Sequence, residues 1–417
     1  MVDSPDSRKD RCEPTGRRLS TSSARGGTGR RLLVLAARVA CACALLAAWG
    51  MPSPAGEWLP GDTHSHISPP DVPPKYNHAA NNLDGAIAAA KVAGLKWIIL
   101  TPHAMDRKDE TSGRLWCVEM GERLAKRTAA EGDPLVVLGW ERTYTWPGHM
   151  TVSFVDLEKV VGLPLEKLLV EVRRQKGLAF VAHPYQLPNF LINRNSSWRP
   201  WTEGPRGQDL DPWLSGLEVF HPISPALSAA ARWDQWIAAE RRRIVGVGAT
   251  DDHWGTLYAT TWVWVEGELT RDALRDGLRM GRVCVGSDAS AGAFTVTSDR
   301  KAPDGNGLVG RIGDTVAADE QVTVTWEADG ATLYVDGKPQ RVDDKRFVHR
   351  FGAEARGSFH WYRLQAGIRS YSNPIYVNLP PQEEPPPPAG DAPKAARDEE
   401  SERHAPSGGS TPTTPRQ

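Results

Sequence analysis

The chain has 417 residues and carries 50 lysines and arginines against 51 aspartates and glutamates, which gives a formal net charge of −1. This balance excludes a global electrostatic attraction to nucleic acid or to anionic membranes. The length suits two domains with terminal tails, and the 40% of apolar residues is ordinary for a soluble globular protein.

Residues 1–55 have the order of a secretory signal peptide. The basic pair Arg30-Arg31 precedes an apolar stretch over residues 32–49, which Arg38 interrupts, and small residues at 53–55 offer a cleavage point. The pair also loosely fits a twin-arginine pattern. An uncleaved N-terminal membrane anchor and a disordered cytoplasmic leader are the alternatives. We therefore expect an exported protein, either periplasmic or extracellular.

Two cysteines, Cys117 and Cys284, lie outside this leader, and the chain has no Cys-x-x-Cys motif. Neither a thiolate zinc site nor a disulfide framework is therefore indicated. The sequence leaves open whether the two cysteines pair.

Short apolar segments alternate with helical ones from residue 56 to residue 287. Strands are expected over 96–100, 135–139, 178–182, 217–220 and 244–247, with a further candidate at 150–154. Helices are expected over 83–93, 119–130, 165–174 and 226–241. This alternation favours a parallel sheet that is covered on both faces. About seven such units in roughly 230 residues suit a (β/α)7 TIM-like barrel better than an open sheet.

Residues 288–378 have a different pattern, in which alternating β-type segments replace the helices. The dipeptide Asp336-Gly337 between two such segments is a hairpin signal. We expect a small β-sandwich here. From residue 379 to residue 417, proline, glutamate, serine and threonine dominate, which is typical of a disordered tail.

The segment Gly61-Asp62-Thr63-His64-Ser65-His66 is expected at the end of a first strand. Side chains two residues apart on a strand point to the same face, so His64 and His66 would share one space. Neutral imidazole is the commonest metal ligand among side chains. Two ordinary surface histidines would give the same pattern, so the metal-binding interpretation depends on other residues.

Further residues of metal-binding type follow the expected strand ends: Asp71, His103, Glu141, His149, His183, Asp251 and His253. In a barrel these ends converge on one face, where active sites lie. Histidines and carboxylates without thiolate suit zinc, manganese or iron(II) better than magnesium. Nine ligands are too many for one ion, so we expect two or three divalent ions that share Glu141. Such a site supports hydrolysis, above all of phosphate esters, whose uncatalysed reaction is very slow.

Five segments resemble the motifs of the polymerase and histidinol phosphatase (PHP) family of metallohydrolases: Asp62-Thr63-His64-Ser65-His66, Ile99-Leu100-Thr101-Pro102-His103, Gly139-Trp140-Glu141, Val181-Ala182-His183-Pro184 and Ala249-Thr250-Asp251-Asp252-His253. Residues 217–220 and 281–285 are also similar. The resemblance covers about residues 58–286 and implies a distorted (β/α)7 barrel with a trinuclear metal site. The ending Tyr371-Ser372-Asn373-Pro374-Ile375-Tyr376 resembles the extra β-domain of the secreted, carbaryl-hydrolase-like branch.

This resemblance implies three ion positions, which are distributed over the nine residues. The first would take His64, His66, Glu141 and Asp251, the second Glu141, His149 and His183, and the third Asp71, His103 and His253. Pro102 stands where the family usually has an aspartate that orients the following histidine. Val72 stands where a glycine normally follows the acidic residue, so His78 is the alternative to Asp71.

Several other residues have two interpretations. His221 and Glu218 flank an expected strand end and either form structural hydrogen bonds or act on the substrate or leaving group. We take Glu141, Asp251 and His221 as the candidate catalytic residues. Arg142 either pairs with an anionic substrate or is solvated or salt-bridged. Six tryptophans expected in loops either pack or line an aromatic pocket: Trp140, Trp146, Trp198, Trp201, Trp213 and Trp254.

These observations predict a metal-dependent hydrolase of a small-molecule ester, with phosphoesterase as the first choice because the ligand set resembles that of family phosphoesterases. A carboxyl- or carbamate-ester hydrolase on the same site is the alternative, since a fold and a site do not settle the substrate. A cell-surface binding module with an inactive barrel is a third hypothesis. Nucleic acid is a disfavoured partner because no basic patch with interleaved aromatic residues stands out. The oligomeric state is not predicted.

Overall fold

The computed structural model describes residues 56–71, 79–143, 146–185, 198–202, 208–222, 226–342, 344–367 and 370–382. The expected leader, His78 and the expected tail beyond residue 382 lie outside this part of the chain. Within it, no helix combines the length and the apolar character that a membrane crossing requires.

Seven strands form the part of the large sheet that carries the candidate site, and they lie in spatial order from β1 to β7. They are β1 (Gly56–Ser65), β2 (Trp97–Leu100), β3 (Leu135–Thr143), β4 (His149–Ser153), β5 (Leu178–Val181), β6 (Gly216–Phe220) and β7 (Val245–Gly248). β1, β2 and β3 are parallel, and so are β5, β6 and β7. The strands β2, β5 and β7 are buried along their whole length, as expected for strands that are covered on both faces.

The segment that follows β7 returns to the end of β1. The N–H of Asp251 donates to the carbonyl of His64, and the N–H of His66 donates to the carbonyl of Asp252, both at 2.9 Å. The sheet therefore curls until the continuation of its seventh strand meets its first. This closure lies at the edge of the sheet where the two histidines of the first motif are placed.

The fold is α/β as expected, but it is not a clear (β/α)7 barrel. β4 is antiparallel to both β3 and β5, because the short connection between Thr143 and His149 cannot form the crossover that a parallel strand requires. β8 (Thr261–Glu266) and β9 (Val283–Val285) continue the sheet beyond β1 in antiparallel pairs. The sequence patterns predicted neither the reversed strand nor this extension.

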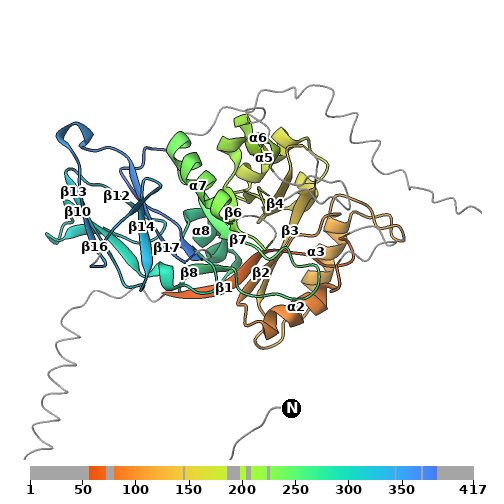
Figure 1. Cartoon of the computed structure of the whole chain (residues 1–417). Helices are drawn as coiled ribbons and strands as arrows, with labels where there is room; N and C mark the ends of the chain where they lie inside the picture. The colour runs from red at the N-terminus through yellow and green to blue at the C-terminus, as the bar shows by residue number, and fades with distance from the viewer. Residues whose placement is uncertain are drawn as a thin grey trace, which may run out of the picture. The chain divides into compact units, whose positions relative to one another are not determined.

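Helices connect most of these strands, and α7 packs along β6 (Figure 1). In α2, the side chain of Asn82 accepts the N–H of Gly85 at the first turn, and buried residues recur at helical spacing on one face. The helix expected at 119–130 begins earlier, at Trp116. The helices are α2 (Leu83–Val92), α3 (Trp116–Lys126), α4 (Leu157–Val160), α5 (Leu165–Arg174), α6 (Arg199–Thr202), α7 (Ala226–Glu240) and α8 (Arg271–Met280), with 3-10 turns η1 (Gln208–Trp213), η2 (Ser290–Gly292) and η3 (Ala353–Ala355).

The strands after residue 288 form two layers around a shared core. One layer is a four-stranded antiparallel sheet, in spatial order β11 (Gly307–Gly310), β10 (Phe294–Lys301), β13 (Gln321–Trp326) and β16 (Arg346–Arg350). The other belongs to the large sheet, because β18 pairs with β9. Its strands are β12 (Thr315–Val316), β14 (Ala331–Val335), β15 (Lys338–Gln340), β17 (His360–Ala366), β18 (Ser370–Ser372) and β19 (Ile375–Val377).

Side chains from both layers, such as Val324 and Leu364, pack in one cluster. The expected sandwich is therefore continuous with the sheet that carries the candidate site, and a domain boundary near residue 287 stays a prediction. The hairpin signal is confirmed, because Val335 on β14 lies opposite Lys338 on β15. Asp336 and Gly337 between them have φ angles of 53° and 76°, as a type I′ turn requires.

Candidate metal centre

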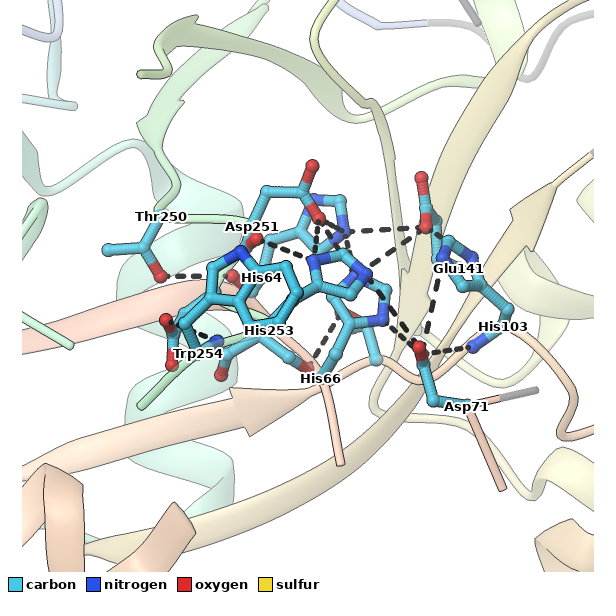
Figure 2. Close-up of polar contacts among 12 residues, drawn as sticks. His64, His66, Asp71, His103, Glu141, Thr250, Asp251, His253 and Trp254 are labelled. Carbon is cyan, nitrogen blue, oxygen red and sulfur yellow. Dashed lines mark hydrogen bonds and ion pairs between the residues drawn. The ribbon is translucent and has the colours of Figure 1, made fainter. Parts of the chain in front are cut away.

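The nine predicted ligands lie together at one edge of the curled sheet, and Figure 2 shows most of them pointing toward one another. His64 lies in β1 and His66 directly follows it. Glu141 lies inside β3 rather than after it, because the strand continues to Thr143. His149 begins β4, and since β4 is antiparallel, its first residue reaches the edge at which the parallel strands end.

The first group of donor atoms has the size of a tetrahedral metal site. His64 Nε2 and His66 Nε2 are 3.0 Å apart. Asp251 Oδ1 lies 3.3 Å from the first nitrogen and 2.9 Å from the second, and Glu141 Oε2 lies 3.6 Å from each. Ligand atoms about 2.0–2.1 Å from a zinc ion are roughly 3.4 Å apart at the corners of a tetrahedron. The five distances bracket that value.

A second group forms around the other oxygen of Glu141. His149 Nδ1 lies 2.7 Å from Glu141 Oε1, and His183 Nε2 lies 3.1 Å from the same oxygen. The two oxygens of one buried carboxylate thus face two different sets of histidines. This arrangement suits a carboxylate shared between two ions.

The third group surrounds Asp71. Its Oδ1 lies 2.5 Å from His66 Nδ1 and 4.0 Å from His103 Nε2, and its Oδ2 lies 3.7 Å from His253 Nε2. His66 therefore faces the first group with one ring nitrogen and the third with the other, which the sequence did not predict. His103 also presents Nδ1 to Glu141 Oε2 at 2.7 Å. Each predicted ligand lies in at least one of the three groups, while ligation itself stays a prediction.

Two carboxylate oxygens in the first group are suited to a bound cation, because they lack hydrogen bonds from the described part of the protein. Glu141 Oε2 and Asp251 Oδ1 are buried, and within the described residues neither makes a hydrogen bond of acceptable geometry, although histidine nitrogens lie close to both. Buried polar atoms normally have partners. Atoms that converge without hydrogen-bond geometry are expected where lone pairs point at a common ion, so the residues present fit divalent metal binding.

The charges in the site depend on these same contacts. Burial alone would lower the pKa of His66, but Asp71 and Asp251 raise it to about 10. Burial alone would raise the pKa of Glu141, but His103 and other histidines around it hold that pKa well below its usual range. In the metal-free site, a proton on His66 thus balances the charge of the carboxylates beside it, a role that divalent ions would take over by displacing such protons.

Glu218 orients two of the predicted ligands. Its Oε1 lies 2.8 Å from His64 Nδ1, and its Oε2 accepts the backbone N–H of His183 at 2.7 Å. The contact with Nδ1 leaves His64 Nε2 to face the first group, as in the carboxylate–histidine–metal arrangements of many metalloproteins. Of the two interpretations of Glu218, the structure shows the hydrogen-bonding one.

His221 is buried beside these groups. Its Nε2 lies 3.5 Å from Asp251 Oδ2 and 3.8 Å from Glu218 Oε2. Burial lowers the pKa of His221 against the opposing influence of both carboxylates. The imidazole is therefore neutral at pH 7, and it is better suited to hydrogen bonding than to acting as a general acid. Its catalytic role stays a prediction.

Arg142 does not lie among these groups. It follows Glu141 directly on β3, and successive side chains of a strand point to opposite faces, so the pattern that turns Glu141 into the site turns Arg142 away. Arg142 is also buried. A direct contact with an anionic substrate, one of its two interpretations, is therefore disfavoured.

Of the six tryptophans expected in loops, Trp140 lies instead in β3, Trp201 in α6 and Trp213 in η1. Trp140 and Trp198 are buried in the core, and Trp201 and Trp213 pack against it. Trp146 lies under the guanidinium of Arg199, 5.4 Å from ring centroid to carbon. Trp254, by contrast, has 73% of its surface exposed. Trp254 has the most exposed ring of the six, and the pocket-wall interpretation stays a prediction.

Asp62 was not singled out by the sequence, although it lies within the first motif. Its carboxylate accepts the N–H and the hydroxyl of Thr250, at 2.9 and 2.8 Å, and the hydroxyl of Thr260 at 2.7 Å. Burial raises its pKa to about 7, although these hydrogen bonds oppose the shift. Asp62 thus fixes the start of the loop that carries Asp251. An acidic residue two positions before His64, in the same expected strand, was the available signal.

Two predicted ligands have left-handed backbone conformations. His183 has a φ angle of 28° and Asp251 a φ angle of 50°. Residues other than glycine adopt positive φ at a cost in free energy, and such residues concentrate at functional sites. Each directly follows the end of a buried strand or the short turn after it, so the turn aims the side chain into the site.

Comparisons with known proteins give no family assignment. No family model matches the sequence, and no curated protein matches it. Among solved structures, the chain is similar to a two-domain protein from Bacteroides vulgatus that contains a predicted PHP-like metal-dependent phosphoesterase, with 14% identity, a TM-score of 0.42, and coverage of 78% of this chain and 95% of that chain.

Two further structures are similar over a smaller part of the chain. PsfC from Pseudomonas syringae has 17% identity and a TM-score of 0.35, with 52% of this chain and 87% of that chain covered. Endonuclease Q, in complex with a duplex that carries an abasic lesion, has 15% identity and a TM-score of 0.39, with 61% of this chain and 70% of that chain covered. Because these identities and TM-scores are low, the interpretation of the site rests on the geometry of this chain alone.

Proposed function

We propose that this chain is a metal-dependent hydrolase of ester bonds, with phosphate esters as its first substrate class. The observation that carries the proposal is the shared carboxylate of Glu141, whose two oxygens face two separate groups of histidines. Adjacent ions held in this way are suited to displacement at phosphorus, where both the attacking and the leaving oxygen need stabilisation.

Bound divalent ions would activate water and polarise the ester, and the chain supplies the residues that hold and orient them. His64, His66, Glu141 and Asp251 would hold the first ion, Glu141, His149 and His183 the second, and Asp71, His103 and His253 the third. Glu218 keeps His64 in one orientation, and Asp62 holds the loop that presents Asp251. His221, buried and neutral, would support Asp251 or the substrate by hydrogen bonding.

The finer assignments are part of the same proposal. The sequence motifs support membership of the PHP family, with its distorted barrel, and of its secreted, carbaryl-hydrolase-like branch. The leader pattern supports export, with a cleaved signal or an N-terminal anchor. The near-zero net charge and the absence of an evident basic patch in the sequence support a small-molecule ester over nucleic acid as the partner.

The test is turnover by the full chain after loading with manganese or zinc. Aryl phosphate mono- and diesters are compared with an aryl methylcarbamate, with His64→Ala as the blank and His349→Ala, a histidine of the distant strand β16, as the matched control. We expect phosphate-ester turnover that falls by at least about a hundredfold in His64→Ala and is unchanged in His349→Ala.

Other results would favour the alternatives. Turnover of the carbamate alone would replace phosphoesterase by a carboxyl- or carbamate-ester hydrolase, which the exposed aromatic residue Trp254 favours as a contact for an apolar substrate. A protein that takes up no metal and turns over neither ester would support the binding module.

A further inference from the structure

Two exposed aromatic side chains lie in the loop that carries Asp251 and His253. Seven large apolar residues are exposed in the described part of the chain, and only Trp254 and Tyr258 among them are aromatic, with 73% and 43% of their surfaces exposed. Both lie between β7 and β8. The other five are Val92, Val170, Leu227, Val309 and Val348. Within the described residues, the aromatic side chains of the exposed class therefore lie in one loop, the loop that supplies two predicted ligands.

This loop has a fixed backbone. The carboxylate of Asp252 accepts the N–H groups of Trp254, Gly255 and Thr256 at 3.1, 2.8 and 3.0 Å, and also the hydroxyl of Thr256 at 3.1 Å. The carbonyl of His253 accepts the N–H of Ala80 at 2.7 Å. The exposure of Trp254 is thus not the result of an unsupported segment, because the backbone that carries it is held on both sides.

The position of Trp254 relates it to the candidate metal centre. It directly follows His253, whose Nε2 lies 3.7 Å from Asp71 Oδ2, so its Cα lies about 3.8 Å from that of a predicted ligand. Figure 2 shows Trp254 on the segment that also presents Asp251 and His253. The backbone that carries this indole therefore lies next to the third group.

Packing does not account for this indole. Trp140, Trp198, Trp233 and Trp236 are all almost completely buried, whereas most of the Trp254 side chain is in contact with solvent. An aromatic ring left in water on a rigid support keeps its apolar surface available for a ligand, and binding sites are typically lined by such rings next to a few polar groups.

We propose that Trp254, with Tyr258 on the same loop, forms an aromatic wall that binds the planar apolar part of the substrate. This inference rests on the proposed function, since it assigns the substrate class as esters that carry an aromatic group. The flat face of the indole stacks on an aromatic ring, while the reacting ester centre lies at the His, Asp and Glu groups. A small alkyl ester would reach these groups without touching the wall.

The test measures binding without turnover, so that the contribution of the aromatic wall to affinity is distinguished from that of the reacting centre. Phenylphosphonate and methylphosphonate present the same anionic head with and without a ring. Their affinities are measured by calorimetry on the metal-loaded full chain, for the wild type, Trp254→Ala, Trp254→Phe and Leu227→Ala. The last variant removes another exposed apolar side chain, from α7. Metal content is measured in every variant.

We expect the wild type to bind phenylphosphonate about tenfold more tightly than methylphosphonate, a difference that corresponds to one favourable aromatic contact. Trp254→Ala should abolish this preference while its methylphosphonate affinity and metal content stay within about twofold of the wild type. Trp254→Phe should keep most of the preference, and Leu227→Ala all of it.

Three results would overturn the inference. An unchanged preference in Trp254→Ala would show that the indole does not touch the ring. Equal losses for both phosphonates, or a loss of metal, would show that Trp254 acts by positioning His253. Failure of the metal-loaded wild type to bind either phosphonate would also overturn it, and only that result, together with absent ester turnover, would overturn the proposed phosphoesterase function as well.

Discussion

The side-chain amide of Asn373 pairs with both backbone polar groups of Gly246. Its Oδ1 accepts the N–H of Gly246 at 2.9 Å, and its Nδ2 donates to the carbonyl of Gly246 at 2.7 Å. Gly246 lies in β7, the last strand in the spatial order of the large sheet, so a single side chain takes the place of a neighbouring strand. The Nδ2 group also donates to the carbonyl of Val283 at 3.1 Å, which ties β7 to β9.

Asn373→Ala is expected to lower the free energy of unfolding by about 2–4 kcal/mol. The substitution leaves buried backbone groups of Gly246 without partners, and each such group costs about 1–3 kcal/mol. Denaturant unfolding followed by circular dichroism measures the change. Asn306→Ala, at an exposed turn, serves as the control and should change stability little. A loss below about 1 kcal/mol in Asn373→Ala would show that other contacts hold this edge.

Glu218→Gln is expected to weaken metal binding by about 10- to 100-fold, because the carboxylate that orients His64 and the backbone of His183 is replaced by a neutral amide. Competition with a chelator measures the affinity. Glu268→Gln, at an exposed position, is the control. Unchanged metal affinity together with reduced turnover would assign Glu218 to the substrate instead of to the ligands.

Asp62→Asn is expected to become more stable relative to the wild type as the pH rises. Burial raises the pKa of Asp62 to about 7, above its value of about 3.9 in an unfolded chain. Its protonated form is therefore favoured in the folded state, and this contribution is present below about pH 4 and lost as the pH rises through 7. The amide of the asparagine does not titrate, so its contribution to the free energy of unfolding does not change with pH.

The difference in unfolding free energy between Asp62→Asn and the wild type should therefore change by a few kcal/mol between pH 4 and pH 8, as measured by urea unfolding in excess chelator. The chelator removes the influence of bound cations on the carboxylate. A difference that stays constant over this range would mean that Asp62 is ionised in the fold without cost.

Removal of divalent ions is expected to lower the melting temperature more at pH 9 than at pH 6. In the metal-free protein, the pKa of His66 is raised to about 10, so its stabilising contribution is complete below about pH 6.5 and is lost as the pH rises through 10. Metal binding has the opposite dependence, because imidazoles bind ions without their protons. The gap between loaded and stripped protein should therefore widen with pH.

Calorimetric melting with and without chelator measures this gap. His66→Ala should show a smaller response to chelator than the wild type at both pH values, whereas His349→Ala should respond as the wild type does. An equal gap at both pH values in the wild type would contradict the assignment of His66 as a residue that exchanges protons for ions.

Local patterns predicted the parts of the site that depend on strand geometry. The two-residue spacing of His64 and His66 and the positions after expected strand ends were enough to gather nine residues, although Glu141 lies within β3 and His149 begins β4. They did not predict that β4 is reversed, because its burial pattern is the same in either direction. They also missed Asp62 and Asn373, whose partners lie 188 and 127 residues away along the chain. No local pattern encodes such pairs.

The left-handed backbone conformations of His183 and Asp251 lower the thermal stability of the fold but place two predicted metal ligands in the site. Glycine at either position would remove the free-energy cost of the strained backbone, which is of order 1–3 kcal/mol. It would also remove a metal-ligand atom from the site. Laboratory evolution for thermal tolerance in metal-free medium should therefore favour glycine at both positions, and the resulting lineages would keep the fold while losing the function.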